Sequence, residues 1–232
     1  GCQVDIDTGC KVEMREFVKL AVGAEAKNVI RSLFFGITAA NKLSARPQGV
    51  ATAACRKVGI LGAGMMGAGI ACAAAEAGLD VVLLDTSAEL AARGKAYADA
   101  RWAKQVQQGR MSEADRAKLA ARIRPTSDLA ALDGCDIVVE AVFEDRALKA
   151  EVTRKAEAML APTAVFASNT STLPITGLAQ ASARPANFIG LHFFSPAEKM
   201  PLVEIIRGQA TSDDCLARAM DFVKALRKTP IV

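Results

Sequence analysis

The stretch that most constrains the fold runs from Lys57 to Asp85. An apolar run of strand type, residues 58 to 61, leads directly into glycines spaced as GxGxxG, namely Gly62, Gly64 and Gly67. An alanine-rich segment from 70 to 77 has the composition of a helix, and a second apolar run, 81 to 84, ends on the carboxylate of Asp85. This order of strand, glycine turn, helix, strand and acid predicts a βαβ unit that binds a dinucleotide.

Each glycine of the turn has a separate expected role. Gly62 allows the tight turn, Gly64 lets the backbone approach a pyrophosphate at the helix N-terminus, and Gly67 lets the helix pack closely on the strand. The carboxylate of Asp85 accepts hydrogen bonds from adenosine ribose hydroxyls and repels a 2'-phosphate. The predicted cofactor is therefore NAD rather than NADP.

A membrane helix is the alternative for this stretch, because no charged residue occurs from Val58 to Ala75. The clustered glycines, and the dominance of Gly and Ala over Leu and Phe, argue against insertion. With 51% hydrophobic residues the chain can bury a sizeable core. The net charge of +4 is spread along the chain and favours neither nucleic acid nor a membrane surface as partner.

The cysteines are scattered among apolar neighbours and form no CxxC pair; they are Cys2, Cys10, Cys55, Cys72, Cys135 and Cys215. A metal site lacks its usual second ligand type, since the chain contains a single histidine. We interpret the cysteines as reduced thiols of a cytoplasmic protein without a metal.

After Asp85, Ser87 is placed to cap a long polar helix that runs to about residue 108, and Gly109 closes it. Ser112 is placed to cap a second helix that ends near residue 121. This helical pair is predicted to project from the sheet. Its basic side chains form either a solvated face or a contact for a phosphorylated substrate tail; they are Lys95, Arg101, Lys104 and Arg110.

The rest of the chain alternates between the two kinds of element. Strands are predicted over 123–126, 136–141, 164–167, 188–191 and 202–206 and in the final KTPIV, and helices over 146–160, near Pro174 and over 212–226. The alternation predicts a Rossmann-like, doubly wound, mostly parallel α/β sheet. Ligands of such sheets bind beyond the carboxyl ends of the strands. The polar residues expected there are Asp85, Glu144, residues 168–172 and His192.

Residues 1–56 form a separate helical linker in this interpretation, and residues 57–232 form the NAD-binding domain. The linker has apolar residues at helical spacing followed by a loop at Pro47 and Gly49. We expect a helical arm that packs on the main domain or on a missing neighbour. Because the chain starts without Met and stops inside a predicted strand, it is interpreted as a fragment of a longer protein.

His192 is the candidate proton-transfer group, because it lies at the carboxyl end of a predicted strand and histidine titrates near working pH. Glu204 lies in apolar company on the next strand, where a buried carboxylate needs a partner. If the two strands are neighbours, Glu204 can bond one imidazole nitrogen and fix the tautomer. The turn of residues 169–171 either donates to a substrate carbonyl or to nicotinamide, or is an ordinary capped turn.

The motifs GAGMMGAGIA, DIVVEAVFED, FASNTSTLPIT and GLHFFSPAEKMPLVEII together resemble the L-3-hydroxyacyl-CoA dehydrogenase family across residues 57–232. The preceding FVKLAVGAEAKNVIRSLFFGITAANK resembles the linker that joins an enoyl-CoA hydratase domain to the dehydrogenase in bifunctional enzymes of the fatty acid oxidation complex alpha-subunit type. The resemblance implies NAD-dependent oxidation of (S)-3-hydroxyacyl-CoA to 3-oxoacyl-CoA in β-oxidation. It also implies a thiolase subunit as partner and a dimer formed through a helical C-terminal domain beyond Val232.

Carried over by position, the resemblance makes His192 the catalytic base, Glu204 its partner and Ser171 a contact of both substrate and nicotinamide. Lys104 falls near the CoA phosphates. The cofactor positions are Gly62, Gly64, Met66, Gly67, Asp85, Glu144, Lys149, Ser171 and Ser195. A 3-hydroxy-acid dehydrogenase of the 6-phosphogluconate type shares a similar glycine loop but lacks HFFSP followed by a glutamate.

Two residues depart from the family pattern. The family often has Asn where this chain has Ser195, and often has ENxxVK where this chain has Asp145 between Glu144 and Lys149. In addition, a substrate-binding Asn of the family's next segment lies beyond Val232. We therefore expect this chain to bind NAD with poor or no turnover. The alternative function is an NAD-binding module that is inactive without its C-terminal domain.

Overall fold

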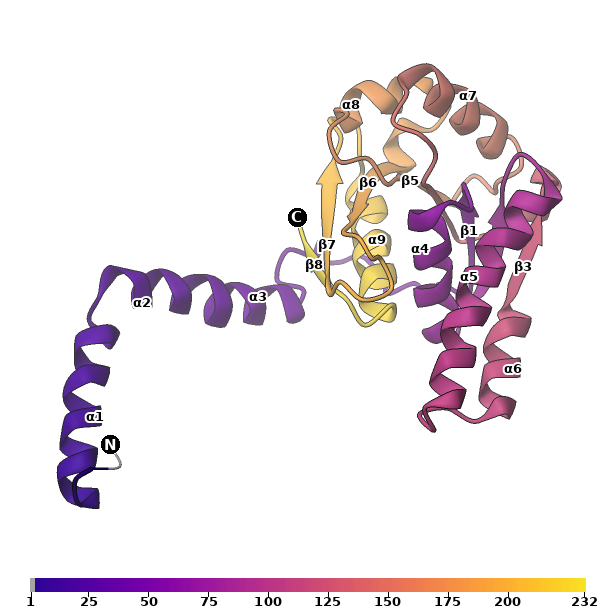
Figure 1. Cartoon of the computed structure of the whole chain (residues 1–232). Coiled ribbons are helices and arrows are strands. Elements are labelled where there is room, and N and C mark those ends of the chain that lie inside the picture. Colours follow the sequence, from indigo (N-terminus) through magenta and orange to yellow (C-terminus); the bar gives the residue numbers. More distant parts are fainter. Residues whose placement is uncertain (1–2) are drawn as a thin grey trace. The chain divides into compact units, whose positions relative to one another are not determined.

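The computed structural model describes residues 3–232, so the interpretation of Cys2 as a reduced thiol lies outside the described residues. The chain divides into two units, of which one ends at Ala45 and the other spans Arg46–Val232 (Figure 1). Among residues 3–232, no helix is both long enough and apolar enough to cross a membrane.

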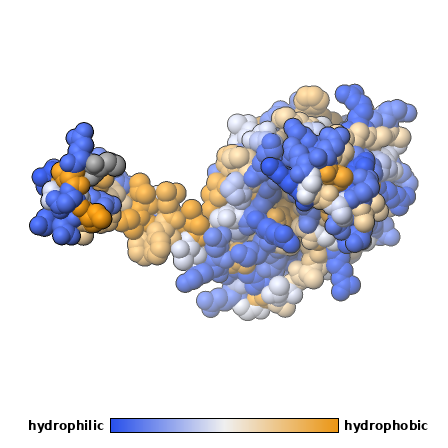
Figure 2. All heavy atoms as spheres, turned by 60° about the horizontal axis from the view of Figure 1, so that its bottom comes forward, coloured by the Kyte–Doolittle hydropathy of each residue, from blue (hydrophilic) through white to orange (hydrophobic). Residues whose placement is uncertain are grey.

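The first unit consists of helices whose apolar side chains are exposed, and the helical pattern predicted there is confirmed. Its elements are α1 (Ile6–Ala21), α2 (Ala24–Val29), the π-helical segment η1 (Ile30–Gly36) and α3 (Ile37–Asn41). None of these elements contains a buried residue. Phe17, Leu33 and Phe34 are each more than half exposed, and Figure 2 shows apolar residues over the surface of this unit.

The second unit is built on one sheet of eight strands in the order β3-β2-β1-β4-β5-β6-β7-β8. The strands are β1 (Lys57–Leu61), β2 (Asp80–Leu84), β3 (Ile123–Thr126), β4 (Ile137–Glu140), β5 (Val165–Ser168), β6 (Phe188–Phe193), β7 (Leu202–Arg207) and β8 (Thr229–Ile231). The strands from β3 across to β6 are parallel, whereas β7 is antiparallel to β6 and β8 is parallel to β7. The predicted Rossmann-like, mostly parallel sheet is confirmed.

The helices connect these strands. They are α4 (Met65–Glu76), α5 (Ala88–Gln107), α6 (Glu113–Arg122), α7 (Arg146–Glu157), α8 (Ile175–Leu178) and α9 (Asp213–Ala225), with short 3-10 turns η2 (Leu129–Leu132), η3 (Ala179–Ala181) and η4 (Pro185–Asn187). Helix α4 begins at Met65, earlier than the predicted start at Ile70. Glycine weakens a helix by about 1 kcal/mol relative to alanine. Because of the glycines at 67 and 69, the sequence did not predict this first turn as helical.

The predicted helical pair is confirmed, and Figure 1 shows α5 and α6 side by side, extending beyond the strands. Ser87 caps α5 by accepting a hydrogen bond from the Leu90 amide at 3.3 Å. Ser112 caps α6 in the same way, from the Asp115 amide at 3.0 Å. Gly109 has a positive φ of 68°, which suits the turn between the two helices.

The segment that leads into β1 is held to α9 by an ion pair. The guanidinium of Arg46 bonds both carboxylate oxygens of Asp221, with Nε to Oδ1 at 2.8 Å and Nη2 to Oδ2 at 2.9 Å. Arg46 also donates to the carbonyl of Val50 at 2.9 Å. A bidentate, half-buried pair of this kind orders residues 46–50 against the second unit.

Helix α5 is anchored by Trp102, which is fully buried and donates from Nε1 to Oε1 of Glu76 on α4 at 2.8 Å. We expect Trp102→Ala to lower the free energy of unfolding by about 3–5 kcal/mol through the cavity it leaves. The control is Tyr97→Phe, at an exposed position of the same helix. It removes only the hydrogen bond from the Tyr97 hydroxyl to Glu198 and should change the free energy of unfolding by less than about 1 kcal/mol. Urea unfolding measures both, and an unchanged midpoint in Trp102→Ala would contradict the anchoring role.

Candidate active site

The glycine turn after β1 has the geometry that its spacing predicts. Gly62 has a positive φ of 92°, and its amide donates to the carbonyl of Leu84 at 2.8 Å. A Cβ on Gly67 would lie 1.7 Å from the carbonyl oxygen of Gly62, so helix and turn touch at that point. A Cβ on Gly64, in contrast, would meet no protein atom within 4 Å. The backbone at Gly67 is therefore in close contact with other protein atoms, whereas the backbone at Gly64 has open space beside it.

The first turn of α4 is open to an anion. Gly64 occupies the N-cap position and offers no side chain to accept the free amides of the first turn. Met66 in that turn is half-buried, and the preceding Met65 is 66% exposed. Uncapped amides at a helix N-terminus beside open space fit a pyrophosphate group.

Asp85 lies against this turn, at the end of β2. Its Oδ2 accepts from the Ala63 amide at 2.7 Å, and its Oδ1 accepts from the Thr86 amide at 2.7 Å. The side chain is half-buried. A carboxylate fixed beside the glycine turn fits the ribose of a dinucleotide and repels an additional phosphate. The residues of this site thus fit NAD.

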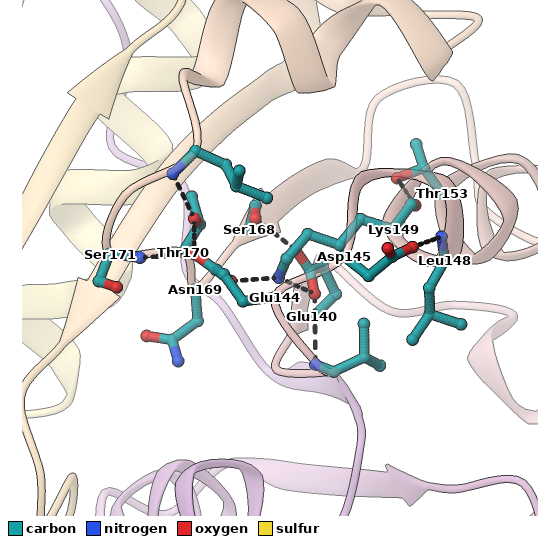
Figure 3. Close-up of polar contacts among 12 residues, drawn as sticks. Glu140, Glu144, Asp145, Leu148, Lys149, Thr153, Ser168, Asn169, Thr170 and Ser171 are labelled. Carbon is teal, nitrogen blue, oxygen red and sulfur yellow. Dashed lines mark hydrogen bonds and ion pairs between the residues drawn. The ribbon is translucent and has the colours of Figure 1, made fainter.

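A buried ion pair between α7 and β4 lies at the carboxyl ends of β4 and β5 (Figure 3). The ammonium of Lys149 on α7 lies 2.9 Å and 3.0 Å from the two carboxylate oxygens of Glu140, and 3.2 Å from Oε2 of Glu144. The hydroxyl of Ser168, directly across from Glu140 in the sheet, donates to the same carboxylate. Glu140 was not predicted as a site residue, although an acid inside the apolar run DIVVEA is the same signal that drew attention to Glu204.

Glu144 holds the turn that follows β5. Its Oε1 accepts from the hydroxyl of Thr170 and from the amides of Ser171 at 3.2 Å and Thr172 at 3.4 Å. Although partial burial raises the pKa of Glu144, the Thr170 hydrogen bond and the Lys149 ammonium together hold this pKa below its usual value. The hydroxyl of Ser171 points away from this network, as Figure 3 shows, and the residue is exposed.

His192 and Glu204 face each other across β6 and β7, as the sequence predicted for neighbouring strands. They are register partners, and Nδ1 of His192 lies 2.7 Å from Oε2 of Glu204. The ring also packs against Phe194, with centroids 4.7 Å apart. The predicted burial of Glu204 is wrong, because its side chain is 41% exposed. Its apolar chain neighbours Val203 and Ile205 are buried, but successive side chains of a strand point to opposite faces.

Two further predicted site residues lie at the surface. Ser195 is exposed in the loop after β6, and Lys104 is exposed on α5. The basic face of the helical pair is partly neutralised, since Lys95 pairs with Asp99 at 3.2 Å and Arg101 with Glu76 at 3.6 Å. A phosphate contact on this face would fall mainly to Lys104 and Arg110.

The cysteines of the described residues carry free thiols. Burial raises the pKa of Cys55 to about 12, of Cys135 to about 11 and of Cys215 to about 12. Burial likewise raises the pKa of Cys72. These groups stay protonated at neutral pH and are poor nucleophiles.

The family described as "3-hydroxyacyl-CoA dehydrogenase, NAD binding domain" matches residues 57–232. The fatty acid oxidation complex subunit alpha of Shewanella baltica is 40% identical over 233 residues, which cover 100% of this chain and 33% of that protein. The chain therefore spans about a third of the length of the curated relatives it matches.

Solved structures give the same assignment. An (S)-3-hydroxybutyryl-CoA dehydrogenase from Ralstonia eutropha superposes with a TM-score of 0.74 at 40% identity, covering 77% of this chain and 63% of that chain. The dehydrogenase part of a multifunctional enzyme from C. elegans superposes with a TM-score of 0.72 at 28% identity, covering 84% and 47%. The resemblance noted in the motifs is confirmed, and the chain belongs to the 3-hydroxyacyl-CoA dehydrogenase family, of which residues 57–232 are the NAD-binding domain.

Proposed function

We propose that this chain supplies the NAD site and the catalytic base of an enzyme that oxidises (S)-3-hydroxyacyl-CoA to 3-oxoacyl-CoA in fatty acid β-oxidation. The observation that carries the proposal is the 2.7 Å contact between His192 Nδ1 and Glu204. His192 lies at the carboxyl end of β6, and the glycine turn lies at the carboxyl end of β1. Since these strands run parallel, both groups lie at one edge of the sheet.

Glu204 determines which imidazole nitrogen can act as the base. Its carboxylate accepts a hydrogen bond from Nδ1–H of His192 and so leaves Nε2 with a free lone pair. Nε2 takes the proton of the substrate hydroxyl, and the carboxylate stabilises the imidazolium that forms. Bound NAD supplies the hydride acceptor. The exposed hydroxyl of Ser171 donates to the substrate oxygen and holds it near His192.

Cofactor binding is assigned to residues at the same edge. The turn amides and the N-terminus of α4, including Met66, bind the pyrophosphate, and Asp85 binds the adenosine ribose. Glu144 and Ser195, both exposed, contact the nicotinamide half, and Lys104 contacts the phosphates of CoA.

The wider setting is part of the same proposal, and the name of the relatives, fatty acid oxidation complex subunit alpha, supports membership of a multi-enzyme complex. In such a complex the chain would act in the cytoplasm beside a thiolase subunit and dimerise through segments beyond Val232, as the family resemblance implies. Relatives about three times as long also support the proposal that this chain alone binds NAD but turns over poorly.

The direct test is calorimetric titration of the purified chain with NAD and NADH, followed by an acetoacetyl-CoA reduction assay on the same sample. Binding with weak turnover, rising when the longer polypeptide is assayed, is the expected result. Turnover by this chain at the rate of the longer protein would show that residues 57–232 suffice. Absence of NAD binding would overturn the proposal.

Cofactor choice is tested at Asp85. We expect Asp85→Ala to weaken NAD binding by about tenfold or more, the loss typical of a charged hydrogen bond, and to leave NADP binding unchanged or stronger. Asp80→Ala is the matched control, because Asp80 begins the same strand and is an exposed partner of Arg122. Titration of each variant with both cofactors measures the ratio, and an unaltered ratio in Asp85→Ala would rule out this role.

A further inference from the structure

The ammonium of Lys149 is buried among carboxylates of the protein. The residue is 1% exposed, and an ammonium has three hydrogens to donate. The Lys149 ammonium has three carboxylate oxygens within 3.2 Å, two from Glu140 and one from Glu144. The ammonium thus donates hydrogen bonds to Glu140 and has Glu144 as a second counter-ion.

The carboxylate of Glu140 is likewise buried and hydrogen-bonded within the protein. It is 1% exposed, and besides Lys149 its carboxylate accepts from the Ser168 hydroxyl and from the Val142 amide at 3.3 Å. Its main-chain carbonyl accepts from the Asn169 amide at 2.8 Å. Burial raises the pKa of Glu140, and the Lys149 ammonium opposes this shift. Glu140 therefore depends on Lys149 to remain a buried carboxylate.

These contacts continue into the turn of residues 169–172. Lys149 forms an ion pair with Oε2 of Glu144 at 3.2 Å, and Oε1 of Glu144 accepts hydrogen bonds from the Thr170 hydroxyl and the Ser171 amide. Asn169 accepts from the Phe193 amide at 2.8 Å, and Phe193 follows His192 in β6. An ion pair and several hydrogen bonds, linked through the main chain of residues 169–171, thus connect Lys149 with the residue beside His192.

We propose that Glu140 and Lys149 are positioning residues, which act through Glu144 to hold the 169–172 turn, and with it Ser171, in place beside His192. This inference rests on the proposed function only for the consequence in catalysis. The arrangement of the turn is a property of the folded chain.

The proposal can be tested by removing the cation of Lys149 alone and by removing it together with the charge of Glu140. Lys149→Met keeps most of the side-chain length but leaves Glu140 and Glu144 facing each other without a cation. Glu140→Gln combined with Lys149→Met removes one of the two carboxylates and keeps the amide able to bond Ser168. The double variant should therefore be less disturbed than the single variant. Lys155→Met is the control, since Lys155 lies on the same helix in an exposed pair with Glu151.

The first measurement is hydrogen exchange of the wild-type chain and the three variants, followed at the amides of Asn169, Ser171 and Phe193, each of which donates within this network. Lys149→Met should speed their exchange by about tenfold or more, and the double variant should recover most of the protection. Lys155→Met should exchange like the wild type. Unchanged exchange in Lys149→Met, or a double variant as disturbed as the single one, would overturn the inference.

The second measurement separates positioning from cofactor contact. The activity is measured in this chain or in the longer polypeptide, whichever reduces acetoacetyl-CoA. There Lys149→Met should lower kcat by about tenfold or more, while the Kd of NAD changes by less than about threefold. A tenfold weaker NAD with an unchanged kcat at saturation would instead make Lys149 a cofactor contact. If exchange responds as expected and no form of the protein turns over, the proposed function fails and the positioning of the turn stands. Glu140→Gln alone gives a second variant if Lys149→Met does not fold.

Discussion

His192→Ala is expected to lower kcat for acetoacetyl-CoA reduction by about a hundredfold or more, because the general acid and base of the reaction is lost. The chain contains no other histidine that could take over the proton transfer. The Kd for NADH should stay within about twofold, since the imidazole lies at β6 and bonds Glu204 rather than the glycine turn. The variant is assayed in whichever form of the protein turns over, with calorimetry on the same sample.

Glu204→Gln provides the graded comparison. Glutamine can still accept from Nδ1–H through its amide oxygen, so the tautomer of His192 is kept and only the stabilisation of the imidazolium is lost. We expect a loss of kcat that is clearly smaller than in His192→Ala. Equal activity of His192→Ala and the wild type would remove His192 from the mechanism, and a loss confined to NADH affinity would assign it to cofactor binding.

The βαβ unit could be predicted from the sequence because its determinants are local. A glycine such as Gly62 with φ of 92°, the caps at Ser87 and Ser112, and short apolar strands each specify their own element. The contact between His192 and Glu204 could also be predicted, since the two residues lie on consecutive strands joined by a short loop.

The predictions failed where the outcome depends on distant parts of the chain. Glu204 was expected to be buried because its sequence neighbours are apolar, yet the face of β7 that it occupies is partly open. The early start of α4 at Met65 rests on contacts of Gly67 with the preceding turn, which overcome the low helix propensity of glycine.

The burial of Lys149 illustrates the same limit at the site. A lysine on an amphipathic helix is usually exposed, and its pairing with Glu140 requires α7 to pack over the end of β4. The motif placed Lys149 among cofactor residues, but only the fold reveals that its ammonium is buried between Glu140 and Glu144. Sequence patterns thus located the edge of the sheet where the proposed active site lies, and packing determined what each charged group there can reach.

Gly67→Ala is expected to destabilise the NAD-binding unit by about 3 kcal/mol or more, which exceeds the usual effect of adding a methyl group to a core. The added Cβ would lie 1.7 Å from the carbonyl oxygen of Gly62, and backbone cannot rotate away as a side chain can. Gly62 in turn cannot shift, because its own amide is bonded to Leu84 and its α-carbon faces the Ala141 carbonyl. Urea unfolding should show a lower midpoint, and NAD binding should be lost with the turn.

Gly64→Ala separates binding from folding at the same turn. Its Cβ would meet no protein atom within 4 Å, and the φ of −66° at Gly64 is allowed for alanine, so the variant should unfold at the wild-type urea concentration. The methyl group would occupy the open side where the backbone is expected to approach the pyrophosphate, and NAD affinity should fall by about tenfold or more. Wild-type affinity in Gly64→Ala would mean that the cofactor does not pass this side of the turn, whereas a wild-type midpoint in Gly67→Ala would mean that helix and turn do not need their close contact.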